Sequence, residues 1–589
     1  MNLDAHDIPL VAALAATILA PLAAALHVAR GGSQVDPRRP AIISLLVALA
    51  ASLTITRAWM SGPEVTLELG QRLGGGFLVH VDGVTAVLLP FVAIVELAIV
   101  MMAPKRFLDG PATSRILLGA ATTFALFSTA HPLVLIMAWV VTALPTWWST
   151  RATPGGQTAA RVYAIMMTLA VACMAVGTVM MIVDPPWEPG VGALGTAGGW
   201  FVALAVLVRK GIVPFHSWYP ALYRGAPMST ALAATVPQIA SYTAVRLFFG
   251  HADHGDGVGA ELVVLSQLAL LTATYGAALA LVQRDLRGLV GTLAMSQSAL
   301  VLAGLAGKLP MELNGAFCTW ISSGLALTGL GLVGWALESR AGPLSLETPQ
   351  GRFADAPLLA AFFLLFGLAS IGLPGTLSFV ADDLLVSGSL DEQLHAGLLV
   401  IAATVLSAIS VMRGWFMVFG GPANLDGPRH HVLPRERIAL TALLATIVLL
   451  GLWPAPLVRE LERAGSELLG VPLEPRDPAA SPRYEKPAGG GTSIDEVGTI
   501  TGDVLVGGEW LRGCAGAGLP GEMKDLDQPV DPQSPREQSC TSVGHPIAAA
   551  TTAPSAPTSR ASASFISASG SIPSPASRSA SRSSSMPAG

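Results

Sequence analysis

Six ionisable side chains lie within long apolar stretches of this sequence, where a charge is costly and is therefore usually functional. They are Glu96, Arg209, Lys210, His216, Asp382 and Asp383. Amine, imidazole and carboxyl groups can take up and release protons, and their surroundings set the pH at which they do so. Arginine keeps its proton in proteins and supplies only a fixed positive charge. The set therefore indicates a path for protons or other ions.

Two further arginines have ordinary structural interpretations. Arg246 closes an apolar stretch, which is typical of an anchor that extends to the lipid head groups. Arg413 lies within another stretch and is expected to pair with a carboxylate. Glu96 has two interpretations, a partner for a neighbouring helix or a transport residue.

Helix breakers accompany both clusters of ionisable residues. Pro214 follows Arg209 and Lys210, and Pro374 precedes Asp382 in Leu373-Pro374-Gly375. A broken membrane helix exposes backbone polar groups, which is tolerated where they line a hydrated cavity or pack against protein. The two interrupted spans are five spans apart. This spacing predicts two inverted five-helix repeats, at about residues 114–250 and 260–420.

The elements that position these residues are apolar stretches of about 20 residues, the length that crosses a bilayer. Only 12% of the 589 residues are charged and 52% are hydrophobic, which excludes an ordinary soluble protein. We predict an all-α polytopic membrane domain over residues 1–465. Its fourteen spans lie near residues 8–29, 40–60, 81–103, 114–130, 132–149, 160–183, 194–220, 226–250, 260–282, 288–307, 311–337, 355–390, 393–420 and 438–458.

Loop charge provides an independent test of this count. Sixteen Lys and Arg residues fall in or beside the connections that follow odd-numbered spans, and three fall in the others. Cytoplasmic loops carry the excess of basic residues, so both ends of the domain are predicted to lie on the outer side. Residues 466–589 are rich in Pro, Gly and Ser and are predicted to form a polar, disordered tail.

Several functions are disfavoured by composition. The net charge is −5, and the apolar part has no long basic run, which disfavours nucleic-acid binding. Four cysteines without a CxxC pair disfavour a disulfide scaffold, a structural zinc site and an iron–sulfur cluster. The histidines in loops lack a ligand set, and no phosphate-binding glycine loop is visible. We therefore expect no metal, no cofactor and no catalytic site in this chain.

Several segments resemble the antiporter-like membrane subunits of respiratory complex I, especially its M and N types. Residues 213–220 (VPFHSWYP), followed by Gly225-Ala226-Pro227, are similar to the family signature VPxHxWxPxxxxxAP. Residues 368–376 (LASIGLPGT) are similar to its LASLGLPGT segment, and residues 283–287 (QRDLR) to its Q-x-D-x-K/R loop. Related hydrogenase subunits, Mrp sodium/proton antiporters and the membrane partners of a bacterial inorganic-carbon uptake complex share the fold.

The resemblance implies a proton-conducting subunit of a translocase of the NADH-quinone oxidoreductase type, in a bacterial cytoplasmic membrane. Its partners would be other membrane subunits, the lipid bilayer, and protons or sodium ions. The redox cofactors would belong to other chains of the complex.

The resemblance also identifies where the family's proton relay falls in this chain. The fifth-helix glutamate corresponds to Val140, the seventh-helix lysine to Arg209 and the eighth-helix lysine to Gln238. The tenth- and eleventh-helix histidines correspond to Gln297 and Ser323, and the twelfth-helix acid to Asp382. Most of these positions cannot change charge. Two alternatives to proton transport therefore stay open: a structural subunit with a degenerate path, or a membrane partner that uses an ion gradient for another task.

Overall fold

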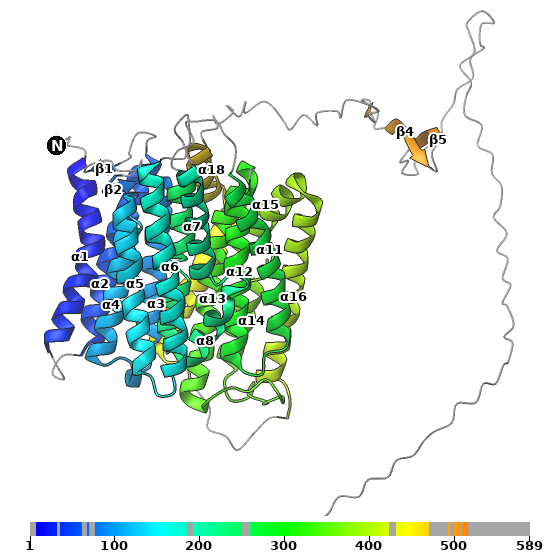
Figure 1. The fold of residues 1–589 in the computed structure, drawn as a ribbon. Coiled ribbons are helices and arrows are strands. Elements are labelled where there is room, and N and C mark those ends of the chain that lie inside the picture. Colours follow the sequence, from blue (N-terminus) through cyan, green and yellow to red (C-terminus); the bar gives the residue numbers. More distant parts are fainter. Residues whose placement is uncertain are drawn as a thin grey trace, which may run out of the picture. The chain divides into compact units, whose positions relative to one another are not determined.

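The computed structural model describes residues 7–31, 36–61, 67–69, 77–184, 193–249, 259–307, 309–422, 431–469, 493–494, 500–506 and 509–515. The chain divides into two units, Met1–Asp477 and Pro478–Gly589. The first unit is a bundle of helices that run roughly along one axis (Figure 1). The predicted domain boundary, 465/466, lies inside the last helix of this unit, which continues to Leu469.

The helices of the first unit account for most of its described residues. They are α1 (Asp7–Gly31), α2 (Arg38–Met60), α3 (Gly83–Met102), α4 (Gly110–Leu126), α5 (Pro132–Ala152), α6 (Gln157–Val183), α7 (Ala193–Lys210), α8 (Trp218–Gly225), α9 (Met228–Thr235), α10 (Ile239–Ala244), α11 (Ala260–Leu281), α12 (Leu286–Leu305), α13 (Pro310–Ala341), α14 (Pro357–Ala369), α15 (Leu377–Glu392), α16 (Leu394–Phe419), α17 (Pro434–Leu452) and α18 (Ala455–Leu469). Short helical turns η2 (Lys105–Phe107) and η3 (Phe215–Ser217) and the π-helical turn η4 (Val245–Phe249) complete the set.

Ten helices in the described ranges are long and apolar enough to cross a membrane, or eleven if the bent pair α17 and α18 counts as one span. The other predicted spans coincide with shorter or interrupted helices: α4, the α9–α10–η4 series, and the α14–α15 pair. The prediction of a polytopic helical domain is therefore confirmed at the level of its architecture. The predicted fourteen spans outnumber the ten or eleven described helices that are long and apolar enough to cross a membrane.

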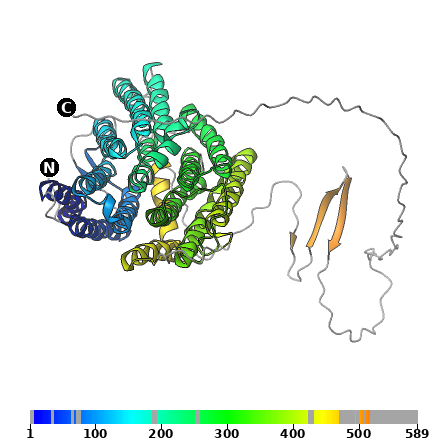
Figure 2. The same cartoon turned by 90° about the horizontal axis from the view of Figure 1, so that it is seen from below.

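The core of the bundle lies at α12, α13 and α3. The most apolar 18-residue segments of α12 and α13 are completely buried and that of α3 is 83% buried, whereas those of α1 and α2 are 28% and 33% buried. Figure 2 shows the first unit along the helix axes, with α1 and α16 at opposite edges. The outer helices expose large apolar side chains, as expected where lipid or another apolar protein surface replaces water.

The two predicted breaks are confirmed. Helix α7 ends at Lys210 and α8 begins at Trp218, and α14 ends at Ala369 and α15 begins at Leu377. Gly211, with φ of +72°, interrupts the helix after α7, and the Trp218 indole N–H donates to the Val208 carbonyl oxygen at 2.9 Å. The same oxygen accepts from the Gly211 backbone N–H at 3.2 Å, so the indole adds a second donor at the end of the helix, where carbonyl groups lack their usual α-helical partners. The signature tryptophan thus stabilises the break.

A third break, which the sequence analysis did not predict, separates α9 from α10. It lies at residues 236–238, where Gln238 adopts a left-handed conformation with φ of +52°. Gln238 is the only non-glycine residue with positive φ in the described part of the chain. A side chain in this region is strained, and such strain concentrates at functional positions.

A pair of short strands and helix α18 lie at the same end of the bundle as the start of α1 (Figure 1). Strands β1 (Leu67–Leu69) and β2 (Val79–Val81) pair antiparallel, so the all-α prediction needs this one amendment. Helix α18 turns by 78° from α17 and packs across α3 and α13. The Arg463 guanidinium lies 4.8 Å from the centre of the Trp59 ring, which ties α18 to α2.

The described residues of the second unit are three strands that form one antiparallel sheet in the order β3-β4-β5. They are β3 (Ser493–Ile494), β4 (Ile500–Val506) and β5 (Glu509–Ala515). These short strands depart from the prediction of a structureless tail. The remainder of residues 478–589 lies outside the described residues, and its predicted disorder stays a prediction.

Candidate functional site

The two adjacent cations at the end of α7 point to different helices. Arg209 is 9% exposed and turns toward α5, and Lys210 is 3% exposed and turns toward α10 and α12. Successive residues of an α-helix differ by about 100° around its axis, which separates the two charges. Each cation therefore belongs to a different part of the interior.

Arg209 is held by neutral groups of α5. Its guanidinium donates to the Trp139 carbonyl oxygen at 2.8 Å and to the Thr142 hydroxyl at 2.8 Å. It also lies 4.7 Å from the centre of the Trp139 ring, in cation–π contact. No carboxylate of the described residues pairs with it. Because arginine stays protonated, Arg209 places a permanent positive charge inside the bundle.

Lys210 is surrounded by three neutral acceptors. Its amine donates to the Gln238 side-chain oxygen, and it lies 2.7 Å from the Ser298 carbonyl oxygen and 3.0 Å from the Ser298 hydroxyl. Three acceptors match the three N–H bonds of an ammonium group. The Ser298 hydroxyl can also reverse and donate to a neutral amine. The site can therefore satisfy both protonation states of Lys210.

The contacts of Lys210 unite two predicted relay elements. Gln238, a predicted relay position, has a left-handed backbone conformation and accepts from Lys210 through its side-chain oxygen. Ser298 follows Gln297, another predicted relay position, on α12. Ser298 was not a predicted site residue. Only tertiary structure reveals it, because 88 residues separate it from Lys210.

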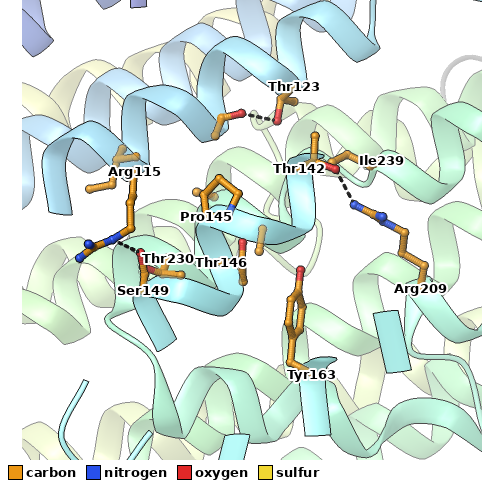
Figure 3. A pocket seen from close by; sticks show the side chains of 14 residues that line it. Arg115, Thr123, Thr142, Pro145, Thr146, Ser149, Tyr163, Arg209, Thr230 and Ile239 are labelled. Carbon is orange, nitrogen blue, oxygen red and sulfur yellow. Dashed lines mark hydrogen bonds between the residues drawn. The ribbon is translucent and has the colours of Figure 1, made fainter. Parts of the chain in front are cut away.

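A polar cavity lies on the Arg209 side of α7 (Figure 3). It measures about 30 Å³, which is room for one or two water molecules. Its polar lining comes from five helices, α4, α5, α6, α7 and α9, and consists of Arg115, Thr123, Thr142, Thr146, Ser149, Tyr163, Arg209 and Thr230. Figure 3 shows Arg115 and Arg209 on either side of Pro145 and Thr146, with the Tyr163 hydroxyl directed at α5.

The two acids of α15 have different surroundings. Asp382 is half-buried, and its carboxylate faces the break between α14 and α15: a β-carbon added at Gly372 would lie 2.6 Å from the Asp382 Oδ2 atom. Gly372 has φ of +82°, so the shape of the turn and the position of the carboxylate both depend on the absence of a side chain there. Asp383, by contrast, is exposed on the surface of the bundle.

Glu96 and His216 also have different surroundings. Glu96, on α3, is 1% exposed, and its Oε2 atom has no hydrogen-bond partner among the described residues. Such a carboxyl group is far easier to bury when protonated. His216, in η3, lies 3.4 Å from the Tyr275 hydroxyl through its Nε2 atom, and the two rings meet edge to face at 5.1 Å. It stands at the break beside Pro214.

Of the remaining predicted relay positions, two lie in the interior of the bundle and one lies at its surface. Gln297 on α12 and Ser323 on α13 are both buried. Val140 is 36% exposed, in the middle of an apolar stripe on the outer face of α5. That stripe consists of Leu133, Met137, Val140, Leu144 and Trp148. Val140, a predicted relay position, therefore lies on the exposed outer face of α5.

The two structural interpretations of buried arginines were wrong. Arg246 is not a lipid-facing anchor: its guanidinium makes two hydrogen bonds of 2.7 Å to the Asp82 carboxylate, and the side chains of both residues are buried. Asp82 also caps α3 by accepting from the Thr85 backbone N–H at 3.0 Å. Arg413 donates to two backbone carbonyl oxygens, those of Gln283 and Leu346, rather than to a carboxylate.

Besides Asp82, four buried acids of the described residues were not predicted from the sequence: Glu312, Glu338, Asp355 and Glu436. Glu312, in the first turn of α13, is 3% exposed and accepts from the Ser389 hydroxyl at 2.8 Å. It lies beside the Glu392 side chain, and its Oε2 atom has no hydrogen-bond partner within the described residues. An acid in the first turn of a helix is commonplace in sequence, since it complements the helix dipole. The burial of Glu312 against α15 could therefore not be predicted from the sequence.

The described residues contain no group of three or more His, Cys, Asp or Glu side chains that could hold a metal ion. The buried polar groups are instead spread over several helices as single amine, amide, hydroxyl and carboxyl groups. This arrangement suits a hydrogen-bonded file of groups and water better than a compact reaction centre.

Comparison with known proteins supports the family resemblance. The profile of a family described as NADH:quinone oxidoreductase/Mrp antiporter, TM, matches residues 158–410. NADH-quinone oxidoreductase subunit M of Pseudomonas aeruginosa is 30% identical over 268 residues, which cover 44% of this chain and 51% of the relative. The chain thus spans about half the length of the curated relatives it matches.

Solved structures extend the likeness to most of the bundle. A chain of respiratory complex I from Thermus thermophilus, with bound NADH, superposes with a TM-score of 0.70 at 20% identity, covering 78% of this chain and all of that one. A chain of the Mrp complex from Dietzia sp. DQ12-45-1b superposes with a TM-score of 0.68 at 19% identity, covering 78% and 97%. Residues 158–410 are therefore similar to the membrane subunits of NADH:quinone oxidoreductases and Mrp antiporters, and the bundle shares the fold of these solved structures.

Proposed function

We propose that this chain conducts protons as a membrane subunit of an energy-coupling complex of the NADH:quinone oxidoreductase type. The observation that carries the proposal is the environment of Lys210. This lysine is buried, meets only neutral acceptors, and has a reversible hydroxyl, Ser298, at 3.0 Å. A passive structural helix has little reason to retain an unpaired lysine in its interior.

The proton path follows helices that pack in succession. Lys210 on α7 contacts α10 and α12 through Gln238 and Ser298. Helix α12 packs on α13, and α13 packs on α15, which carries Asp382. Buried Gln297 and Ser323 lie on α12 and α13 and can hold water in a hydrogen-bonded file. Lys210 is the switching base of this path, and Asp382 is its acid.

The other charged candidates have supporting roles. Arg209 supplies a fixed field near Lys210, since it cannot release its proton. His216 lies at the break between α7 and α8, and Glu96 adds a carboxyl group on α3. Asp383, which is exposed, stands at the surface of α15 and is the weakest candidate for the path.

The proposal includes fourteen spans, with α7–α8, α9–α10–η4 and α14–α15 each serving as one interrupted span. The α7–α8 and α14–α15 breaks would then be equivalent positions of two inverted five-helix repeats. Both ends of the membrane domain would lie outside a bacterial cytoplasmic membrane. The apolar stripe on α5 would face lipid or a neighbouring subunit, and redox cofactors would be held by other chains of the complex.

The test is proton flux into membrane vesicles that carry the assembled complex. Lys210→Ala should abolish the flux, and Lys210→Arg should abolish it equally, because arginine keeps the charge but does not release the proton. Asp382→Asn should also fail, whereas Asp382→Glu should be tolerated. Arg209→Lys should retain flux, because the positive charge is preserved.

Lys105→Arg is the matched control, because Lys105 is an exposed lysine in a connection between helices. Native gels of the solubilised complex establish that each variant assembles. If Lys210→Ala assembles and supports flux at the wild-type rate, the proposal is wrong. If the variants change assembly alone, the chain is a structural subunit with a degenerate path.

A further inference from the structure

The cavity beside Arg209 is electropositive and has no carboxylate in its lining. Two guanidinium groups line it, Arg115 on α4 and Arg209 on α7. Asp109, the acid that acts electrostatically on Arg115, caps α4 by accepting from the Ala112 backbone N–H at 2.7 Å and does not line the cavity. The buried positive charge of Arg209 is thus compensated only by neutral dipoles in the described part of the chain. Burial of a charge without a counter-charge is unfavourable.

A ladder of hydroxyl groups connects the two arginines. Thr142, Thr146 and Ser149 line the cavity from one face of α5, at helical spacings of four and three residues. Thr142 accepts from Arg209, and Ser149 accepts from Arg115 at 3.0 Å. These two hydroxyls lie seven residues apart, which is about 10 Å along a helix. The Thr142 hydroxyl donates its own proton to the Ala138 carbonyl oxygen at 2.6 Å, whereas the Ser149 hydroxyl, which accepts from Arg115, can donate its proton into the cavity.

The fourth hydroxyl approaches from the opposite side. Tyr163, on α6, lines the cavity and points its hydroxyl toward α5 (Figure 3). A guanidinium group and the hydroxyls of Thr146, Ser149 and Tyr163 in the lining of a space of about 30 Å³ match the size and hydrogen-bonding needs of one small anion. It does not suit a cation, because the two fixed charges would repel it.

We propose that this cavity binds a small monovalent inorganic anion, such as chloride, as the counter-ion of Arg209. Arg115, which is half-buried, lies near the end of the bundle that carries the arginine-rich connections and attracts the anion into the cavity. The anion then lies between Arg209, Thr146 and Tyr163. This assignment is independent of proton transport, since it concerns the charge balance of Arg209 and not the release of a proton.

The experiment is equilibrium binding of radiolabelled chloride to the purified full-length chain in detergent, with gluconate maintaining ionic strength. The wild type should show one saturable site from which bromide, but not gluconate, displaces the label. Arg209→Gln should abolish this binding. Thr146→Val and Tyr163→Phe should weaken it about ten-fold each, the loss expected of one hydrogen bond to an ion. Both of these variants retain the two arginines and so remain informative if Arg209→Gln fails to fold.

Arg413→Gln is the matched control. It removes a membrane arginine that contacts two backbone carbonyl oxygens and does not line the cavity, so chloride binding should be unchanged. Absence of saturable chloride binding in the wild type would show that water alone fills the cavity and would overturn the proposal. Binding that persists in Arg209→Gln, or that Thr146→Val and Tyr163→Phe leave at wild-type strength, would place the anion elsewhere and would overturn it too.

Discussion

At the scale of single residues, the interior of the bundle balances its charges in two ways. Arg246 and Asp82 form a buried ion pair with two hydrogen bonds of 2.7 Å. Arg209 and Lys210 instead meet neutral oxygen atoms. An ion pair of this geometry holds its partners in one state, which suits a structural tie between α3 and η4. A lysine among neutral acceptors is free to change its protonation state, which suits the proposed relay.

The ion pair makes a prediction about stability. Asp82→Asn keeps a side-chain oxygen to cap α3 but leaves the Arg246 charge buried without a counter-charge, with the Thr85 hydroxyl and the Tyr242 ring as its remaining partners. It should lower the free energy of unfolding by about 3–5 kcal/mol. The double variant Asp82→Asn with Arg246→Met should recover much of this loss, because no unpaired charge remains.

Denaturant unfolding of the purified chain measures both changes. Arg224→Gln is the control, because it breaks the pair with Asp285 in which both side chains are about 40% exposed or more. Its expected cost is about 0–1 kcal/mol. Equal losses at the buried and the exposed pair would contradict the interpretation.

At the scale of elements, close helix contacts position the acid of the proposed path. Helix α13 passes so near α15 that a β-carbon added at Gly315 would lie 2.6 Å from the Leu385 backbone nitrogen. Leu385 is three residues beyond Asp382 on the same helix. The absence of a side chain at Gly315 therefore lets α13 pack closely on α15. This packing sets the position of α15, and with it the position of the Asp382 carboxylate.

Gly315→Ala should separate α13 from α15, because the obstructing atoms belong to the backbone and cannot rotate away. The expected loss of stability is about 1–3 kcal/mol, and proton flux should fall as Asp382 moves. Gly119→Ala on α4 is the matched control, since its nearest neighbour would lie 3.9 Å from the new β-carbon. That substitution should be neutral or stabilising by up to about 1 kcal/mol. Thermal unfolding and vesicle flux measure the two effects, and wild-type values for Gly315→Ala would refute the argument.

At the scale of the whole molecule, the uneven distribution of basic residues between the two ends of the bundle indicates its orientation in a bilayer. Arg115 and Ser149 contact each other at the end of the bundle where α4 begins and α5 ends, next to the basic Lys105 and Arg151. The start of α1 and the β1–β2 hairpin lie at the other end (Figure 1). Basic connections at one end and few at the other are typical of a membrane protein with a defined orientation.

This orientation can be tested with reporter fusions. Fusions after Arg39, Arg161 and Arg437 should report the cytoplasm, and fusions after Pro185 and Leu390 should report the outer side. Basic connections stay in the cytoplasm during insertion, so the two groups should alternate along the chain. Paired fusions to alkaline phosphatase and green fluorescent protein give opposite signals and control for expression. A cytoplasmic signal after Pro185 would contradict the fourteen-span arrangement.

The sequence by itself determined the class of the protein, the two proline-associated breaks and the positions of the buried cations. These features depend on local composition and on residues close together in the chain, such as Pro214 with Gly211 and Pro374 with Gly372. Apolar length selects a membrane helix, and helix breakers interrupt it whatever surrounds them. The same local signals carry the family resemblance.

Only the tertiary structure decided what each charge touches. Lys210 meets Ser298 across 88 residues, and Arg246 meets Asp82 across 164. Val140 faces outward, although its neighbour Trp139 contacts Arg209. In a helix that is apolar on all sides, periodicity does not reveal which face is inside, because lipid and protein interior select the same residue types. The partners of the charges, and the cavity between them, therefore emerge only when the helices pack.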